Sequence, residues 1–263
     1  IDEAGRVVAL KMLNWPPYEI IPLELGELLL TLERGPIIDW ASLTEEGMDG
    51  VAGLLDYNMA WRPIPWLAVE FMPGGSLRDR LEWLGWRELA RLVADAAAVL
   101  SHLHARGVCH LNVRPENMMF DARGRLCLTD LGLLELDEWL LAHTTIDDVD
   151  AKMLVRVLTY TPPERIGKSW RELGVEADIY QLGITLYEAL TGELPFGEDL
   201  RLLMRLKKLG RAKEPQPPHE VRPDIPAELS DITLKAMSEN PNERHSNILE
   251  FERELRAVLR SEA

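Results

Sequence analysis

A few polar residues lie where phosphate or metal chemistry could take place. Lys11 stands in the middle of an apolar run, a pattern that by itself favours a solvent-facing lysine at a sheet edge over a phosphate ligand. Asn117 and Asp130 carry hard oxygen donors of the kind that Mg²⁺ prefers, although an aspartate shortly before Gly132 is also typical of a turn. His110 could act as an acid or a base, but a histidine buried in the core is the simpler interpretation.

The elements that would position these residues follow from apolar periodicity. Strands are predicted at residues 6–13, 51–57, 66–71, 118–120 and 125–129. Helices are predicted at residues 86–106, 178–191, 198–209, 227–237 and 247–260. Three stretches are less regular: 14–50, in which 23–32 could be helical, an irregular segment from about 130 to 163, and a Pro-rich ordered loop at 214–226. The pattern predicts an α+β fold in which a small β-rich lobe precedes a helical lobe.

Composition bounds the partners and the compartment. The net charge of -15 over 263 residues argues against a nucleic-acid or anionic-membrane surface, because both need concentrated Lys and Arg. Cys109 and Cys127 do not make a disulfide framework, so we expect a reducing, cytoplasmic setting in which both are small buried residues. No apolar run of about 18 residues is present, so no membrane insertion is expected. Ile1 is not an initiator Met, and we expect the chain to be a fragment.

Several short motifs together resemble those of the serine/threonine protein kinase family, in the family's order and near its spacing. Residues 110–117, HLNVRPEN, resemble the catalytic loop H-R-D-L-K-P-E-N, and residues 130–132, DLG, resemble D-F-G. The other matches are VALK at 8–11, VEFM at the hinge position 69–72, YTPPE at 160–164, ADIYQLG at 177–183 and NPNER at 240–244.

These motifs extend over most of the chain, roughly from Arg6 to Leu259. The resemblance therefore implies a bilobal protein-kinase-like fold. A small, truncated, β-rich N-lobe with the hinge would occupy residues 1–72, and a larger helical C-lobe would occupy residues 73–263.

The resemblance also assigns roles to the polar residues. Lys11 matches the lysine that holds the α- and β-phosphates of ATP, and Asp130 and Asn117 match the two Mg²⁺ ligands. Four further residues match positions around the nucleotide: Ala9, Val69, Glu70 and Met72. ATP and Mg²⁺ are therefore the cofactors that the resemblance implies, although a degenerate domain could bind neither.

The chain departs from the family where a substrate would be activated. Asn112 stands at the position of the catalytic aspartate, and a neutral amide takes up a proton very poorly. Removing a general base typically costs about 10²–10⁴ in rate. Arg114 replaces the neighbouring lysine. Leu111 replaces the arginine that would pair with a phosphorylated activation loop, and Val157 replaces the threonine that would brace the aspartate.

Two other parts of the kinase machinery cannot be assigned from the sequence. The glycine-rich loop that would precede Lys11 is absent from this sequence, where Gly5 is the only glycine before Lys11; either the sequence begins inside the second strand or the loop is not encoded. A glutamate on the helix after that strand would pair with the lysine, and none lies at the distance expected from the strand near 51–55. The candidates for it are Glu24, Glu27 and Glu33.

The remaining matched residues are expected to be structural. Asp178 should be buried at the head of the central helix and bond backbone groups of the catalytic loop. Glu164 and Arg244 should form a buried ion pair, whose breakage on one side costs about 3–5 kcal/mol. Three more should shape the site without reacting: His110, Leu131 and Gly132.

These features leave three functions open. A pseudokinase would be a regulatory or protein-binding module that acts on a protein partner or an attached domain and could still bind ATP. A weakly active serine/threonine kinase would transfer the γ-phosphate of ATP to protein hydroxyls without the aspartate. A purely structural module would have its pocket closed by side chains. Asn112 and Val157 favour the first over the second, and Lys11 and Asp130 favour both over the third.

Overall fold

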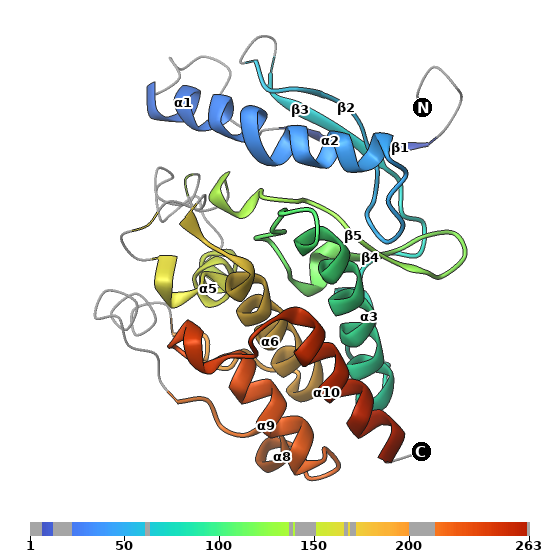
Figure 1. Ribbon diagram of the computed structural model, residues 1–263, viewed down its shortest axis with the longest axis vertical. Helices are drawn as coiled ribbons and strands as arrows, with labels where there is room; N and C mark the ends of the chain where they lie inside the picture. Colours follow the sequence, from blue (N-terminus) through green and yellow to red (C-terminus); the bar gives the residue numbers. More distant parts are fainter. Residues whose placement is uncertain are drawn as a thin grey trace.

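The chain folds into two parts, a smaller one built on a β-sheet and a larger one built from helices (Figure 1). The computed structural model describes residues 7–12, 23–60, 64–136, 139, 151–165, 168, 172–199 and 214–261. The two-lobed α+β architecture expected from the sequence is confirmed. Gly5 and nearly all of the predicted helix at 198–209 lie outside the described residues.

The smaller part contains a three-stranded antiparallel sheet in the order β1-β3-β2. β1 (Val8–Met12) pairs with β3 (Trp66–Glu70), and β2 (Leu54–Asn58) pairs with the other edge of β3. Ala9 lies opposite Val69, and Lys11 lies opposite Leu67, two residues further along β1. Because side chains in a strand alternate between the two faces, Ala9 and Lys11 lie on the same face of the sheet. The strands predicted in this region are confirmed, with ends shifted by a few residues.

A long bent helix lies beside this sheet (Figure 1). It consists of α1 (Leu23–Leu32), a π-type turn η1 (Glu33–Ile37) and α2 (Ile38–Glu45). The bend falls at Gly35, whose φ of -130° and ψ of -105° are not helical, next to Pro36, which has no N–H to donate. Trp40 is fully buried and donates its indole N–H to the carbonyl of Ala52 at 2.7 Å, which anchors the helix to the chain before β2.

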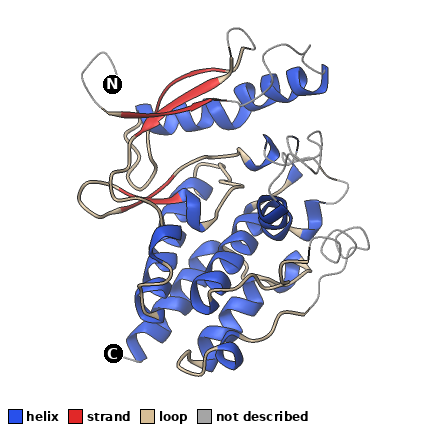
Figure 2. Cartoon of the chain, turned by 180° about the vertical axis from the view of Figure 1, so that it is seen from behind, coloured by secondary structure: helices blue, strands red, loops and turns tan. Residues whose placement is uncertain are grey.

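The larger part is almost entirely helical (Figure 2). Its central helix is α6 (Val175–Thr191). Every residue of α6 from Ala177 to Leu190 is buried. α3 (Trp86–His104), α9 (Ala227–Ala236) and α10 (Ile248–Ser261) pack against it or against one another. These four helices confirm the predictions for their regions. The polar side chains of a helix that is buried on all sides need hydrogen-bond partners inside the protein, so those of α6 bond to neighbouring segments.

A short hairpin carries the two residues that match metal ligands. β4 (Met118–Phe120) and β5 (Leu126–Leu128) pair antiparallel, with Met119 opposite Cys127. Asn117 ends the turn η3 (Pro115–Asn117) directly before β4, and Asp130 follows β5 by two residues. The hairpin therefore brings residues that are thirteen apart in the sequence to the same side of the larger part.

Two predictions for irregular segments were wrong. The segment before Pro163 contains α5 (Ala151–Tyr160), and the Pro-rich loop contains a single helical turn, α8 (Pro218–Val221). α5 was missed because its β-branched residues Val155, Val157 and Thr159 lower helix propensity, whereas burial of one face stabilises the helix in the fold. The remaining short turns are η2 (Arg78–Arg80), η4 (Pro163–Arg165) and η6 (Pro241–Glu243).

None of the helices within the described ranges is both long enough and apolar enough to cross a membrane.

Candidate functional site

An ion pair connects the two parts of the molecule at the site. Lys11 in β1 donates from Nζ to both carboxylate oxygens of Asp130, which follows β5. The Lys11 side chain is 41% exposed and that of Asp130 is 13% exposed. Within the described residues, neither Glu27 nor Glu33 contacts Lys11, and the side chain of Glu24 lies outside them. The lysine and the aspartate that match phosphate and metal ligands thus neutralise each other.

Asp178 holds the backbone of the catalytic loop. Its fully buried carboxylate accepts the N–H groups of His110 at 2.8 Å and Leu111 at 2.7 Å, and it lies 2.8 Å from Nε2 of His104. Leu111 has a φ of 55° and Asp130 a φ of 65°, both in the left-handed region that non-glycine residues rarely adopt. The bonds from Asp178 compensate for this local strain at Leu111.

Asn112 is buried, with 2% of its surface exposed. Its Nδ2 donates to the backbone carbonyl of Asp130 at 2.9 Å, and the backbone carbonyl of Asn112 accepts from Nδ2 of Asn117 at 2.8 Å. The side-chain Oδ1 is buried and has no hydrogen-bond partner within the described part of the chain. The Asn112 amide therefore ties the catalytic loop to Asp130. Its Oδ1, the only acceptor of the side chain, is buried and so is not exposed to a substrate hydroxyl.

The turn η3 positions Asn117, which is 3% exposed. Its N–H donates to the carbonyl of Arg114 at 2.9 Å, and its carbonyl accepts from Thr129 at 3.0 Å. The Arg114 side chain is half-buried beside it. In the described ranges no group of three or more His, Cys, Asp and Glu side chains could hold a metal ion by itself. A Mg²⁺ ion would depend on Asp130, Asn117 and oxygens that a ligand supplies.

An apolar cluster occupies the place where the family resemblance leads one to expect polar bracing. Leu111 packs against a small buried cluster that includes Val157 from α5. The remaining members are Leu134, Leu173 and Ala177. Leu111 and Val157 are the two positions at which the resemblance implies that an apolar residue replaces a polar one, so both replacements contribute to the same apolar cluster. Thr159, two residues further along α5, donates its hydroxyl to the carbonyl of Val155 at 2.8 Å and is fully buried, so it does not act as a brace.

The four residues expected around a nucleotide lie on two neighbouring strands and the segment after them. Val69 and Met72 are buried, and Ala9 is half-buried opposite Val69. Glu70 is tied to Gly53, which accepts its N–H at 2.8 Å and donates an N–H to its Oε2 at 3.2 Å. The carboxylate and the backbone N–H of Glu70 are therefore both directed towards the chain before β2 and not towards a nucleotide.

The ion pair expected in the larger part is present. Arg244, whose side chain is fully buried, donates Nη1 and Nη2 to the two oxygens of Glu164, each at 2.7 Å. Its remaining donors bond the carbonyls of Glu176 and Ser238, each at 2.8 Å. Because the guanidinium is held by one carboxylate and two carbonyls, η4 is fixed to the start of α6.

A close contact at Gly132 was not foreseen. Gly132 has a φ of 71° and donates its N–H to the carbonyl of His110 at 2.8 Å. A Cβ at this position would overlap Pro36, so the bend of the long helix presses directly on the DLG segment. The Gly35-Pro36 pair was visible in the sequence as a helix breaker, but its contact with a residue almost a hundred positions away was not.

Burial keeps the thiols and the imidazole near the loop unreactive. Burial raises the pKa of Cys109 to about 12 and that of Cys127 to about 11. Cys127 is buried as expected, whereas Cys109 is half-buried. Burial lowers the pKa of His110 below its usual value, although the charge of Asp178 opposes this. Its Nε2 has no partner within the described residues, so this core histidine is only half satisfied. At neutral pH the thiols are protonated and His110 is uncharged.

The family model and the similar proteins both point to the protein kinase domain family. Residues 55–255 match the model of the protein kinase domain. The serine/threonine-protein kinase PknB of Mycolicibacterium smegmatis is 28% identical over 204 residues, which make up 76% of this chain and 31% of that protein. The serine/threonine-protein kinases pkn3 and Pkn1 of Myxococcus xanthus are 31% and 28% identical to the chain.

The matches cover much of this chain but a minor share of each relative. For pkn3 the match covers 78% of this chain and 38% of that protein, and for Pkn1 it covers 81% and 30%. The chain thus spans about a third of the length of the curated relatives it matches.

Proposed function

Because the chain belongs to the protein kinase domain family, we propose that it is a pseudokinase domain, a regulatory or protein-binding module that does not transfer phosphate at a useful rate. A protein partner or an attached domain would receive its signal. The relatives are named as serine/threonine kinases. Relative to such kinases, the proposal is that this chain has lost the catalytic base and could have kept nucleotide binding.

The observation that carries the proposal is the state of Asn112. A catalytic base must reach the hydroxyl whose proton it takes. The Asn112 side chain instead donates to the carbonyl of Asp130, and its Oδ1 is buried. A neutral amide in this position has neither the charge nor the access that the reaction needs.

The apolar cluster around Leu111 and Val157 supports the same proposal. Polar groups at these two positions would link the activation segment to the loop through hydrogen bonds or a phosphate. Apolar packing supplies that link here, and it does not depend on phosphorylation.

Nucleotide binding is the part of the family's chemistry that the chain could retain. Lys11 would hold phosphate oxygens, while Asp130 and Asn117 would hold Mg²⁺, whose charge offsets that of the phosphates. The present pairing of Lys11 with Asp130 fits such a site, since a Mg²⁺-nucleotide would offer each group a new partner of opposite charge. The same pairing also suits the structural alternative, in which side chains close the pocket.

Thermal denaturation with and without ATP and Mg²⁺ separates these versions. If the site binds with a Kd near 0.1 mM, 1 mM nucleotide should raise the Tm by about 2–4 °C. Asp130→Ala and Lys11→Met should each abolish the shift. An unchanged Tm in the parent protein at millimolar nucleotide would leave the structural module as the better description.

A transfer experiment separates the pseudokinase from a weak serine/threonine kinase, the second candidate, which the retained Lys11 and Asp130 favour. Radiolabelled ATP and a generic protein substrate are incubated with the parent chain and with Asp130→Ala. Equal labelling in the two supports the pseudokinase. Labelling that disappears in Asp130→Ala supports the weak kinase.

A further inference from the structure

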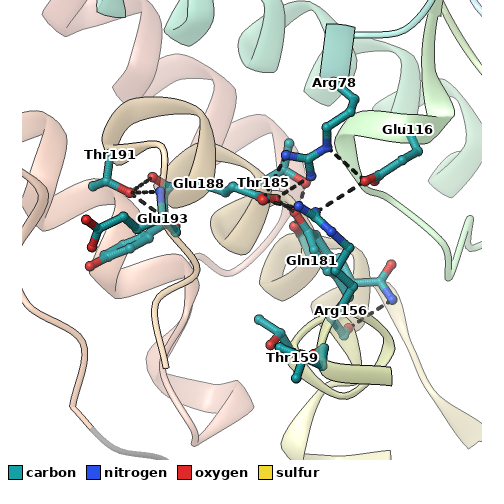
Figure 3. A network of polar contacts seen from close by, with 12 residues as sticks. Arg78, Glu116, Arg156, Thr159, Gln181, Thr185, Glu188, Thr191 and Glu193 are labelled. Atoms are coloured by element: carbon teal, nitrogen blue, oxygen red, sulfur yellow. Dashed lines mark hydrogen bonds and ion pairs between the residues drawn. The ribbon is translucent and has the colours of Figure 1, made fainter. Parts of the chain in front are cut away.

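A closed set of charged contacts joins α5 to the catalytic loop (Figure 3). Arg78 in η2 donates Nε to Glu116 at 2.8 Å, and its two terminal nitrogens to Glu188 at 2.8 and 2.7 Å. Arg156 in α5 donates Nη1 to Glu116 at 3.2 Å and to Glu188 at 3.0 Å. Tyr160, one turn further along α5, donates its hydroxyl to Glu188 at 2.7 Å. Four elements are thereby connected: η2, η3, α5 and α6.

The two arginines hold the carboxylates unequally. Arg78 uses three nitrogens and binds Glu188 in a bidentate way, which is the stronger arrangement. Arg156 uses one nitrogen for both carboxylates, at longer distances, and its side chain is 31% exposed. If Arg156 moved away, the 3% exposed Glu188 would still be paired with Arg78. Arg156 is therefore the member that can leave without stranding a buried charge.

The charges of the group also favour the contact of Arg156 with Glu116 and Glu188. Glu116 and Glu188 carry two negative charges, and Arg78 neutralises one of them. Burial opposes ionisation of Glu116, but the charge of Arg78 holds the pKa of Glu116 below its usual value, so the carboxylate is ionised at neutral pH. The charge of Arg114 also acts on Glu116, so loss of Arg156 would remove one positive charge from this group, next to Asn117, and leave its carboxylates to Arg78 and Arg114.

The two ends of α5 differ in burial, and the exposed end is the one that can separate from the rest of the larger part. Lys152 and Met153 at its start are exposed, whereas Val157, Thr159 and Tyr160 near its end are buried. Arg156 directly follows Val155, the first buried residue in the described part of the helix, so Val155 must leave its apolar cluster when Arg156 moves. The buried end would remain as an anchor while the exposed start lifts away and carries Arg156 off the carboxylates.

We propose that Arg156 is a latch that holds α5 closed over Glu116 and Glu188, and that α5 opens locally when this contact is lost. The closed latch denies the two carboxylates to any other cation, including one on a polypeptide that approaches the loop from this side. The device is independent of phosphate transfer, so it would operate in a pseudokinase and in a weak kinase alike.

Hydrogen exchange measured by mass spectrometry on the whole chain tests the latch. Arg156→Gln removes the contact, and Arg256→Gln is the matched control. Arg256 is 35% exposed and likewise bonds two carboxylates, Glu252 at 2.7 Å and Asp95 at 3.0 Å, but it lies on α10. We expect amides of α5 to exchange about fivefold faster in Arg156→Gln, with α6 and α9 unchanged. Arg256→Gln should leave α5 as it is.

Two outcomes would overturn the proposal. One is unchanged exchange in α5, which would mean that apolar packing alone holds the helix. The other is equal acceleration in α5, α6 and α9, which would mean that the variant weakens the whole domain. Arg156→Lys keeps the charge but loses the planar group, and under the proposal its α5 exchanges at a rate between those of the parent and Arg156→Gln.

Discussion

At the scale of single residues, Asn112 illustrates how one substitution changes the use of a position. Its Nδ2 donates to the carbonyl of Asp130, a bond that an ionised aspartate could not make. The side chain at this position thus serves as a donor that ties two loops together. Restoring the acidic residue should therefore harm the fold.

Asn112→Asp should lower the free energy of unfolding by about 1–3 kcal/mol at neutral pH, because a buried carboxylate would face a carbonyl without a donor. Urea denaturation measures the change. The same substitution at the exposed Asn242 is the control and should cost less than about 0.5 kcal/mol. If Asn112→Asp proves as stable as the parent, the tie to Asp130 is not formed in solution.

At the scale of elements, the long bent helix and the DLG segment act on each other through Pro36 and Gly132. An added Cβ at Gly132 would meet Pro36, whereas one at Gly124 would meet nothing within 4 Å. Both glycines have positive φ, 71° and 75°. Substituting alanine at Gly124 therefore measures the free-energy cost of the left-handed backbone alone, and substituting it at Gly132 adds the cost of the overlap with Pro36.

Gly124→Ala should cost about 1 kcal/mol from its left-handed backbone, and Gly132→Ala should cost at least about 1 kcal/mol more from the overlap. Combining Gly132→Ala with Pro36→Gly should recover part of the extra cost, and a double-mutant cycle in urea measures the coupling. Additive effects of the two changes would argue against direct contact between the bend and the glycine.

The elements were predicted from the sequence where periodicity was clear and missed where it was not. α3, α6, α9 and α10 have long apolar faces or long apolar runs, and the prediction found all four. α5 was missed although one of its faces is apolar, because its β-branched residues lower helix propensity and its packing against α6 supplies the stabilisation. The ion pair of Lys11 with Asp130 and the apolar cluster that Leu111 and Val157 share join distant segments, so the sequence could suggest the residues but not how they come together.

At the scale of the whole molecule, buried histidines make stability depend on pH. Burial lowers the pKa of His110 below 6.5, and burial together with Lys235 lowers that of His245. Below pH about 6.5 the unfolded chain binds protons that the folded chain does not, so the free energy of unfolding falls as the pH falls. Below about pH 4.5, protonation of Glu116 should add to the loss, since its pKa is lowered in the fold.

His110→Phe should make the stability of the domain less sensitive to pH between 7 and 5, with a difference on the order of 1 kcal/mol over that interval. Urea denaturation at several pH values gives the two curves. His245 is retained in this variant, so a residual slope is expected. Parallel curves for the parent and the variant would show that His110 does not titrate with folding.

The most direct test of the account is the rate at which the purified chain moves phosphate from ATP to a protein substrate. Active kinases typically turn over at about 1–100 s⁻¹. Because Asn112 is neutral and buried, we predict that labelling by the parent chain equals the background given by Asp130→Ala. Transfer at the typical rate, abolished by Asp130→Ala, would contradict the claim that this site has lost its base.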